Sequence, residues 1–159
     1  MADDKRYWED FQPGEVLTYG ARTLDRDEII EFARQYDPQP FHTDEAAAAD
    51  SVFGGLIASG GQTSSLMMRM LVDNELRHSS SMGSPGVKSL RWLKPVRPGD
   101  TLSVRRTTLR KARHPRRAEL GFVDSRFEVI NQRSEVVLRM ESSGLFLLRE
   151  PQAATTGAD

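Results

Sequence analysis

The spacing of hydrophobic residues changes twice along this chain, and the changes divide it into three parts. Residues 15–24 favour a strand, because Val16, Leu17, Thr18 and Tyr19 supply β-prone residues. Apolar residues then recur at helical spacing up to Tyr36, and a second, more apolar helical stretch covers residues 56–72. After residue 86 hydrophobic and polar residues alternate, which is typical of strands. The pattern predicts one strand, then helices, then about four antiparallel strands in an α+β domain.

The first helix carries start and stop signals. Asp25 can accept a hydrogen bond as the N-cap, and Glu28, three residues later, completes a capping box. The helix is expected to end near Tyr36, because Asp37 precedes Pro38 and a residue before proline is disfavoured in the α region.

Prolines and glycines set the boundaries of the segment after this helix. Pro38 and Pro40 bracket one residue and are expected to keep this part of the chain extended. Thr43 is expected to be the N-cap of a short helix over residues 44–50. A pair of glycines then breaks the chain, and the apolar helix is expected to start close to residues 59–61.

The second half reads as strands separated by turns. Residues 73–86 are rich in Ser, Gly and Pro and are expected to form a long mobile loop. Residues 87–96 follow as a strand, and residues 97–100 place Pro and Gly where a type II turn needs them. Residues 131–134 predict a further turn before a last long strand over residues 136–148.

The composition is that of an ordinary globular domain. The chain has 159 residues and a net charge of −1, so bulk charge gives no case for binding nucleic acid or an anionic membrane. It has no Cys, no apolar stretch long enough to cross a membrane and no apolar signal segment at its start, so a cytoplasmic location is expected. Residues 1–150 are expected to form one domain, and residues 151–159 a disordered tail.

Asp37 and His42 are the first candidates for chemistry. They lie five residues apart, so on a helix they would not share a face, whereas in an extended loop both side chains could converge on one solvent molecule. A carboxylate beside an imidazole can move a proton to and from water near neutral pH. The alternative is an Asp that forms a turn and a His that makes a local hydrogen bond.

Gly60 and Gly61 are the second candidates, at the expected start of the apolar helix. Amides there have no partner within the helix and lie at the positive end of its dipole, and glycine lets a ligand approach closely. Such an amide can polarise a carbonyl, although the same glycines also suit a plain junction between loop and helix. A metal site is not expected, because His42 and Asp44 lack a third ligand at suitable spacing and the chain has no Cys.

A dense basic cluster lies between two predicted strands. Residues 110–117 read RKARHPRR and are expected to form the end of a hairpin. The cluster suits either a solvated loop or a contact to the phosphates of a nucleotide-bearing thioester. Nucleic acid binding is not expected, because no recognised DNA- or RNA-binding motif accompanies the cluster.

Taken together, three motifs resemble the MaoC-like dehydratase family, the (R)-specific enoyl-CoA hydratases of the hydratase 2 type. Residues 37–44, DPQPFHTD, resemble that family's Asp and His segment. Residues 53–60, FGGLIASG, resemble its entry to the central helix, and residues 90–100, LRWLKPVRPGD, resemble a strand and turn. The resemblance covers about residues 10–148 and implies a hotdog fold, in which a curved sheet of about five strands wraps around one long helix.

The resemblance also implies roles. Asp37 and His42 would activate a water that adds to a trans-2-enoyl-CoA, and the Gly60 amide would bind the thioester carbonyl. No metal or other cofactor is implied, CoA being part of the substrate. A homodimer or higher homo-oligomer is expected.

Six further residues are expected to bind the substrate by the same resemblance, and three of them depart from the family pattern: Gln39, Phe41 and Gly61, which is a second glycine directly after Gly60. Gln39 stands where Asn is usual, and Phe41 where an aliphatic residue is frequent, so the shape of the pocket and the choice of substrate are open. Two other functions stay open: a hotdog thioesterase, or a binding protein for acyl thioesters without catalysis. The six expected substrate-binding residues are Gln39, Phe41, Phe53, Gly55, Ser59 and Gly61.

Overall fold

The computed structural model describes residues 4–151. Its elements, in chain order, are η1 (Trp8–Asp10), β1 (Val16–Thr23), α1 (Arg26–Tyr36), α2 (Pro40–Thr43), α3 (Glu45–Ala49), α4 (Gly60–Asn74), η2 (Leu76–His78), β2 (Val87–Trp92), β3 (Thr101–Arg113), β4 (Leu120–Ile130) and β5 (Val136–Leu147). No helix within this described part is long and apolar enough to cross a membrane.

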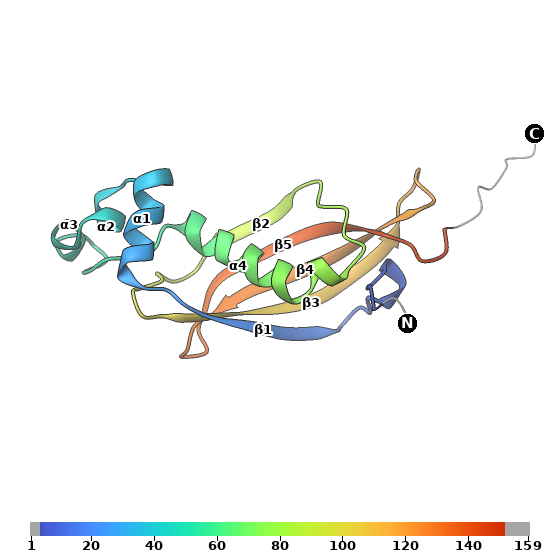
Figure 1. The fold of residues 1–159 in the computed structure, drawn as a ribbon, viewed down its shortest axis with the longest axis horizontal. Helices are drawn as coiled ribbons and strands as arrows, with labels where there is room; N and C mark the ends of the chain where they lie inside the picture. Colours follow the sequence, from blue (N-terminus) through green and yellow to red (C-terminus); the bar gives the residue numbers. More distant parts are fainter. Residues whose placement is uncertain (1–3, 152–159) are drawn as a thin grey trace, which may run out of the picture.

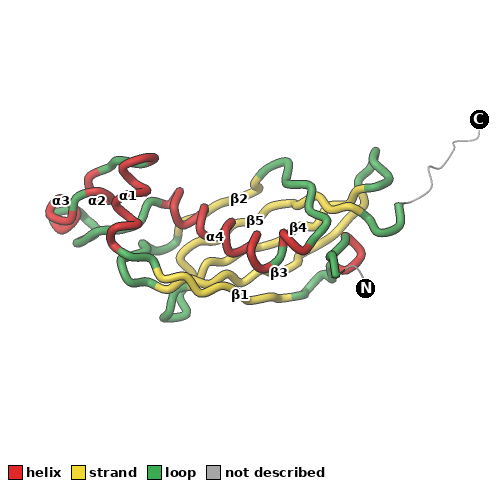
Figure 2. Tube along the Cα trace, in the orientation of Figure 1, coloured by secondary structure: helices red, strands yellow, loops and turns green. Residues whose placement is uncertain are grey.

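The five strands form one antiparallel sheet in the order β1-β3-β4-β5-β2. Figure 1 shows the sheet curving around α4, with α1, α2 and α3 gathered at one end of the molecule and η1, in dark blue, at the other. Figure 2 shows α1, α2 and α3 set apart from the strands along the long axis, whereas α4 lies against the sheet. This is the α+β arrangement that the change of hydrophobic periods predicted, and it has the hotdog form that the family resemblance implied.

The helix α4 fills the inside of the sheet because its apolar side chains lie on one face. Leu66, Met67, Met70 and Leu71 are all buried in one cluster with residues from β3, β4 and β5, and the partly buried Tyr19 of β1 and Leu90 of β2 pack against it. Burial of such side chains is the dominant stabilising contribution to the fold. The packing leaves no room at Gly20 on β1, where an added Cβ would lie 2.5 Å from the sulfur of Met70.

The start of α1 confirms the predicted capping box. The Asp25 carboxylate accepts a hydrogen bond from the Glu28 amide, and the Glu28 carboxylate accepts one from the Asp25 amide. The helix ends at Tyr36, as predicted, and the Asp37 amide still donates to the carbonyl of Ala33. Asp37 is therefore fixed at the end of a regular helix.

Two predictions for the segment after α1 were wrong. The chain is extended only as far as Gln39, because Pro40 then starts the short helix α2, where a proline is tolerated at the first position. Asp44, and not Thr43, is the N-cap of α3, because the Asp44 carboxylate accepts a hydrogen bond from the Ala47 amide at 2.9 Å.

The prediction of one long loop over residues 73–86 was also wrong in part. Its first residues complete α4 and form η2, and Ser79 and Ser80 are buried. Ser79 pairs with Arg6 and Ser81 pairs with Phe146 in isolated β-bridges. Partners far away in the sequence therefore hold this segment, and local composition gave no sign of them.

The end of α4 away from α1 rests on a buried group of charges. Arg106 on β3 is 1% exposed, and its Nη2 lies 2.5 Å from Oε1 of Glu75. Glu75 also accepts hydrogen bonds from Arg6 and from the Tyr19 hydroxyl, both at 3.2 Å. Glu15 completes the group by pairing with Arg106 at 3.0 Å and with Arg6. Two positive and two negative side chains balance here, which is the condition under which buried charges are tolerated.

Candidate active site

A cavity of about 450 Å³ lies at the start of α4, beside α2 and the end of β2. It is at the end of the molecule where α1, α2 and α3 gather (Figure 1). Eight of the nine predicted site residues line it: Asp37, Gln39, Phe41, His42, Phe53, Ser59, Gly60 and Gly61. Gly55 is the exception; the guanidinium of Arg97 lies 3.3 Å from where a Cβ of Gly55 would be.

Asp37 and His42 converge as the extended-loop argument anticipated, although a helical turn brings them together. The Nε2 atom of His42 lies 3.2 Å from Oδ2 of Asp37. The Nδ1 atom donates to the carbonyl of Ile57 at 2.7 Å, and a carbonyl can only accept, so Nδ1 carries a hydrogen. Nε2 is therefore the nitrogen left to exchange a proton. His42 is 5% exposed, whereas the Asp37 side chain is 27% exposed toward the cavity.

The Asp37 carboxylate is held on both oxygens. The Gln39 side-chain amide donates to Oδ1 at 2.7 Å, and the Ser59 hydroxyl donates to Oδ2 at 2.7 Å. These two hydrogen bonds, the Gln39 bond foremost, hold the pKa of Asp37 below its ordinary value; partial burial opposes them and the nearby His42 adds to the lowering. Asp37 is consequently a carboxylate at neutral pH and a proton acceptor.

Aromatic rings form one wall of the cavity. The Phe41 ring packs edge-on against the His42 imidazole with centroids 4.6 Å apart, and it lies 5.2 Å from the Phe53 ring. The Ile57 amide donates to the Phe41 carbonyl, so the segment before α4 is bonded directly to α2. These contacts fix the imidazole plane and exclude water from its buried side.

The N-terminus of α4 faces the same cavity. Gly60 is the first helical residue and Ser59 is the N-cap, whose hydroxyl accepts a hydrogen bond from the Gly61 amide at 3.2 Å. The Gly60 amide, being in the first turn, has no acceptor within the helix and lies at the positive end of the helix dipole. A carbonyl placed in the cavity can therefore accept from this amide.

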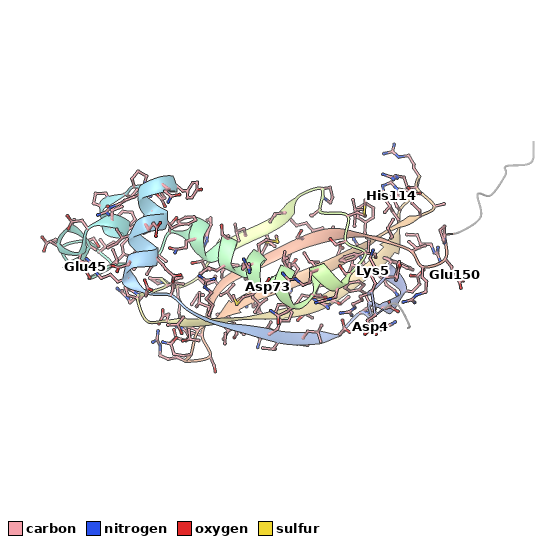
Figure 3. All side chains as sticks on the ribbon, in the orientation of Figure 1. Asp4, Lys5, Glu45, Asp73, His114 and Glu150 are labelled. Atoms are coloured by element: carbon pink, nitrogen blue, oxygen red, sulfur yellow. The ribbon has the colours of Figure 1, made fainter. Side chains whose placement is uncertain are left out.

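The basic cluster of residues 110–117 does not line this cavity. It covers the last residues of β3 and the first part of the connection to β4, and Figure 3 shows His114 at the end of the molecule opposite Glu45 of α3. Arg110 pairs with Asp124, and Lys111 donates to the carbonyls of Trp8 and Glu9. The contact to phosphates stays a prediction, and within one chain it would be made far from Asp37.

A family model described as MaoC like domain matches residues 10–125. This chain belongs to the MaoC-like dehydratase family. Protein MaoC of Klebsiella aerogenes is 37% identical over 117 residues, which cover 72% of this chain and 34% of that protein. The chain thus matches only about a third of the length of this relative.

Solved structures agree with this family. The structure of the MaoC-like dehydratase from Rhodospirillum rubrum is 36% identical and superposes with a TM-score of 0.84, covering 91% of this chain and 98% of that chain. The R-hydratase PhaJ1 from Pseudomonas aeruginosa has a TM-score of 0.69 and 23% identity, covering 92% of this chain and 88% of that chain. Likeness at this lower identity shows the shared fold alone.

Sequence reasoning missed nine residues that line this MaoC-like cavity, and three of them, Thr63, Trp92 and Lys94, carry a polar group on the side chain. Trp92 matters most, because its indole Nε1 donates to the Gly60 carbonyl at 2.9 Å. The alternation over residues 87–96 predicted a strand that contains Trp92, but alternation gives no distance from that strand to the start of α4. Lys94 lines the rim and pairs with Glu135 at 2.9 Å.

Proposed function

We propose that this protein is a hydro-lyase that adds water reversibly to a trans-2-enoyl-CoA or a related unsaturated acyl thioester. The observation that carries the proposal is the meeting of Asp37, His42 and the Gly60 amide in one cavity. Membership of the MaoC-like dehydratase family supports the reaction class. The product would be a 3-hydroxyacyl thioester.

In the proposed reaction Asp37 and His42 hold one water between them. As the water oxygen bonds to the β-carbon, the pair takes one of its protons, and the electrons of the carbon–carbon double bond move toward the thioester carbonyl. A proton is then returned to the α-carbon, so the elements of water are added and none is left over. The Asp37 carboxylate and the exchangeable Nε2 of His42 suit this transfer.

The Gly60 amide would stabilise the negative charge that develops on the thioester oxygen. Hydrogen-bond donors that are already oriented lower the energy of such a transition state without reorganisation. The Trp92 indole and the Ser59 N-cap both hold this end of α4, so the donor is fixed before the substrate arrives. The proposed mechanism uses only groups of the chain, the thioester and the added water.

Two experiments separate this function from its alternatives. Purified protein is mixed with crotonyl-CoA and longer or branched enoyl-CoAs, and the loss of enoyl absorbance is followed beside the release of free thiol. A hydratase consumes the enoyl absorbance and releases no thiol, whereas a thioesterase releases thiol from saturated acyl-CoA. A binding protein without catalysis would give heat of binding by calorimetry with no turnover, and that result would reject the proposal.

A further inference from the structure

The Ser59 hydroxyl makes two hydrogen bonds that join separate parts of the candidate site. Its oxygen accepts from the Gly61 amide at 3.2 Å, which is the ordinary bond of an N-cap. Its own hydrogen is donated to Oδ2 of Asp37 at 2.7 Å. Ser59 is 2% exposed, so water does not compete strongly for either bond. Capping needs only the acceptor, and the second bond is therefore an addition to it.

The chain of bonds continues beyond Ser59 to the sheet. The Gly60 carbonyl and the Gly61 amide are the two ends of one planar peptide group. The Trp92 indole donates to that carbonyl, the amide donates to Ser59, and Ser59 donates to Asp37. All three bonds run in one direction, with the donor on the Trp92 side and the acceptor on the Asp37 side. Hydrogen bonds in such a chain strengthen one another.

We propose that Ser59 is a positioning residue that couples the Asp37 carboxylate to the N-terminus of α4, with Trp92 at the far end of the same chain. The inference rests on the proposed hydratase function. It adds the residue that holds the water-binding Asp37 and the carbonyl-binding Gly60 amide in fixed relative positions. Asp37 would bind the water and Gly60 the thioester carbonyl, so their relative placement sets whether the water faces the β-carbon. An error of about 1 Å in such placement can cost about a hundredfold in rate.

The charges around Asp37 make this coupling measurable. His42 is the titratable group in contact with Asp37, and Lys94 lines the cavity from the segment after β2 while paired with Glu135. Gln39 holds the other carboxylate oxygen. A hydrogen bond donated to a carboxylate favours its ionised form, so loss of the Ser59 bond raises the pKa of Asp37.

The first test reads the Asp37 carboxyl directly by ¹³C NMR titration and needs no enzymatic activity. In Ser59→Ala the Asp37 titration is expected to move to higher pH, and in Ser59→Thr, which keeps a hydroxyl, to return toward that of the unchanged protein. Ser59→Gly removes the hydroxyl while retaining most of the capping preference, which guards against loss of the helix start. Ser65→Ala is the matched control, because the Ser65 hydroxyl donates to the Gly61 carbonyl at 2.8 Å and Ser65 does not line the cavity.

The second test follows kcat/KM for enoyl-CoA hydration against pH. Ser59→Ala is expected to lose about tenfold, mainly in kcat, and its acid limb should move to higher pH because protonated Asp37 cannot accept a proton. Trp92→Phe keeps a ring and removes the indole donor; it should move the Asp37 titration in the same direction by a smaller amount. An unchanged titration in Trp92→Phe would overturn the extension of the chain to Trp92.

The outcomes separate the two proposals. An Asp37 titration that is identical in Ser59→Ala, Ser59→Gly and the unchanged protein would overturn the coupling, even if the enzyme hydrates enoyl-CoA. A shifted titration in a protein that hydrates none of the enoyl-CoAs would uphold the coupling and reject the proposed function.

Discussion

The indole of Trp92 lies directly against Gly60. A Cβ added to Gly60 would stand 2.5 Å from Cε2 and 2.6 Å from Nε1 of that ring, closer than real atoms pack. The same Nε1 donates to the Gly60 carbonyl at 2.9 Å. The first residue of α4 is therefore a glycine because an edge strand covers it, and this contact fixes the end of the helix that faces Asp37.

Gly60→Ala tests this contact. The added methyl group must displace Trp92, so we expect kcat/KM for enoyl-CoA hydration to fall at least about tenfold and the protein to lose about 1–3 kcal/mol of stability. Gly61→Ala is the control, because its nearest contacts would be 3.5 Å or longer and ordinary. Equal behaviour of the two variants in thermal unfolding and in kinetics would show that Trp92 does not restrain Gly60.

His42 offers a substitution that separates chemistry from structure. His42→Asn can still donate a hydrogen bond toward the Ile57 carbonyl, but it lacks Nε2. We expect kcat to fall at least about a hundredfold while the unfolding midpoint changes little. His114→Ala, at the opposite end of the molecule, should leave kcat unchanged (Figure 3). Retention of kcat in His42→Asn would remove the imidazole from the mechanism.

The buried charges below α4 predict a large effect on stability. Glu75→Gln would leave the guanidinium of Arg106, which is 1% exposed, with one charged partner in place of two. We expect the free energy of unfolding in urea to fall by about 3–5 kcal/mol. Glu135 is 31% exposed and pairs with Lys94 and with Arg133, so Glu135→Gln removes only partly exposed ion pairs and should cost less than about 1 kcal/mol. Similar losses in both variants would contradict this account of the buried group.

The environment of Asp124, on the outer face of the sheet, predicts that the stability of the protein depends on pH. Burial raises the pKa of its carboxyl, but hydrogen bonds from Lys88, Ser143 and Arg110 outweigh this and lower the pKa from 3.8 to about 2. Because the folded pKa is the lower one, the stabilisation is complete above pH 3.8 and is lost as pH falls toward 2.

Comparing the protein with Asp124→Asn separates the contribution of this carboxyl to the pH dependence of stability from those of the other carboxyls. The unchanged protein should be more stable than the variant by up to about 2 kcal/mol at pH 6, and the difference should shrink through the window below pH 4. Urea unfolding at several pH values measures it. A difference that stays constant with pH would mean that Asp124 is not held in its ionised form by these partners.

The parts of the fold and site that sequence predicted rest on residues near one another in the chain. The capping box of Asp25 and Glu28 spans three positions and is a local signal. Asp37 and His42 are five positions apart, so either a short loop or a helical turn can bring them together. The predicted chemistry of the pair is the same in both cases. The alternation that predicted the strands is likewise local, since it depends only on which face of each strand is buried.

The missed features depend on contacts between distant residues. Trp92 reaches Gly60 across 32 positions and Ser59 reaches Asp37 across 22, and neither contact leaves a pattern along the chain. The helix α2 has four residues, too few to be stable by propensity alone, and is held by the bonds of His42 and Phe41 to Ile57. Prolines around Gln39 therefore suggested an extended segment where tertiary contacts make a turn of helix.

One measurement bears most directly on the proposed function: the loss of enoyl absorbance when the purified protein meets crotonyl-CoA and longer or branched enoyl-CoAs, with Asp37→Asn beside it. Asn keeps the shape of the side chain and removes its charge. The account predicts rapid loss of absorbance on at least one of these thioesters, slowed at least about a hundredfold in Asp37→Asn. No loss on any of them, or a loss that Asp37→Asn leaves undiminished, would contradict it.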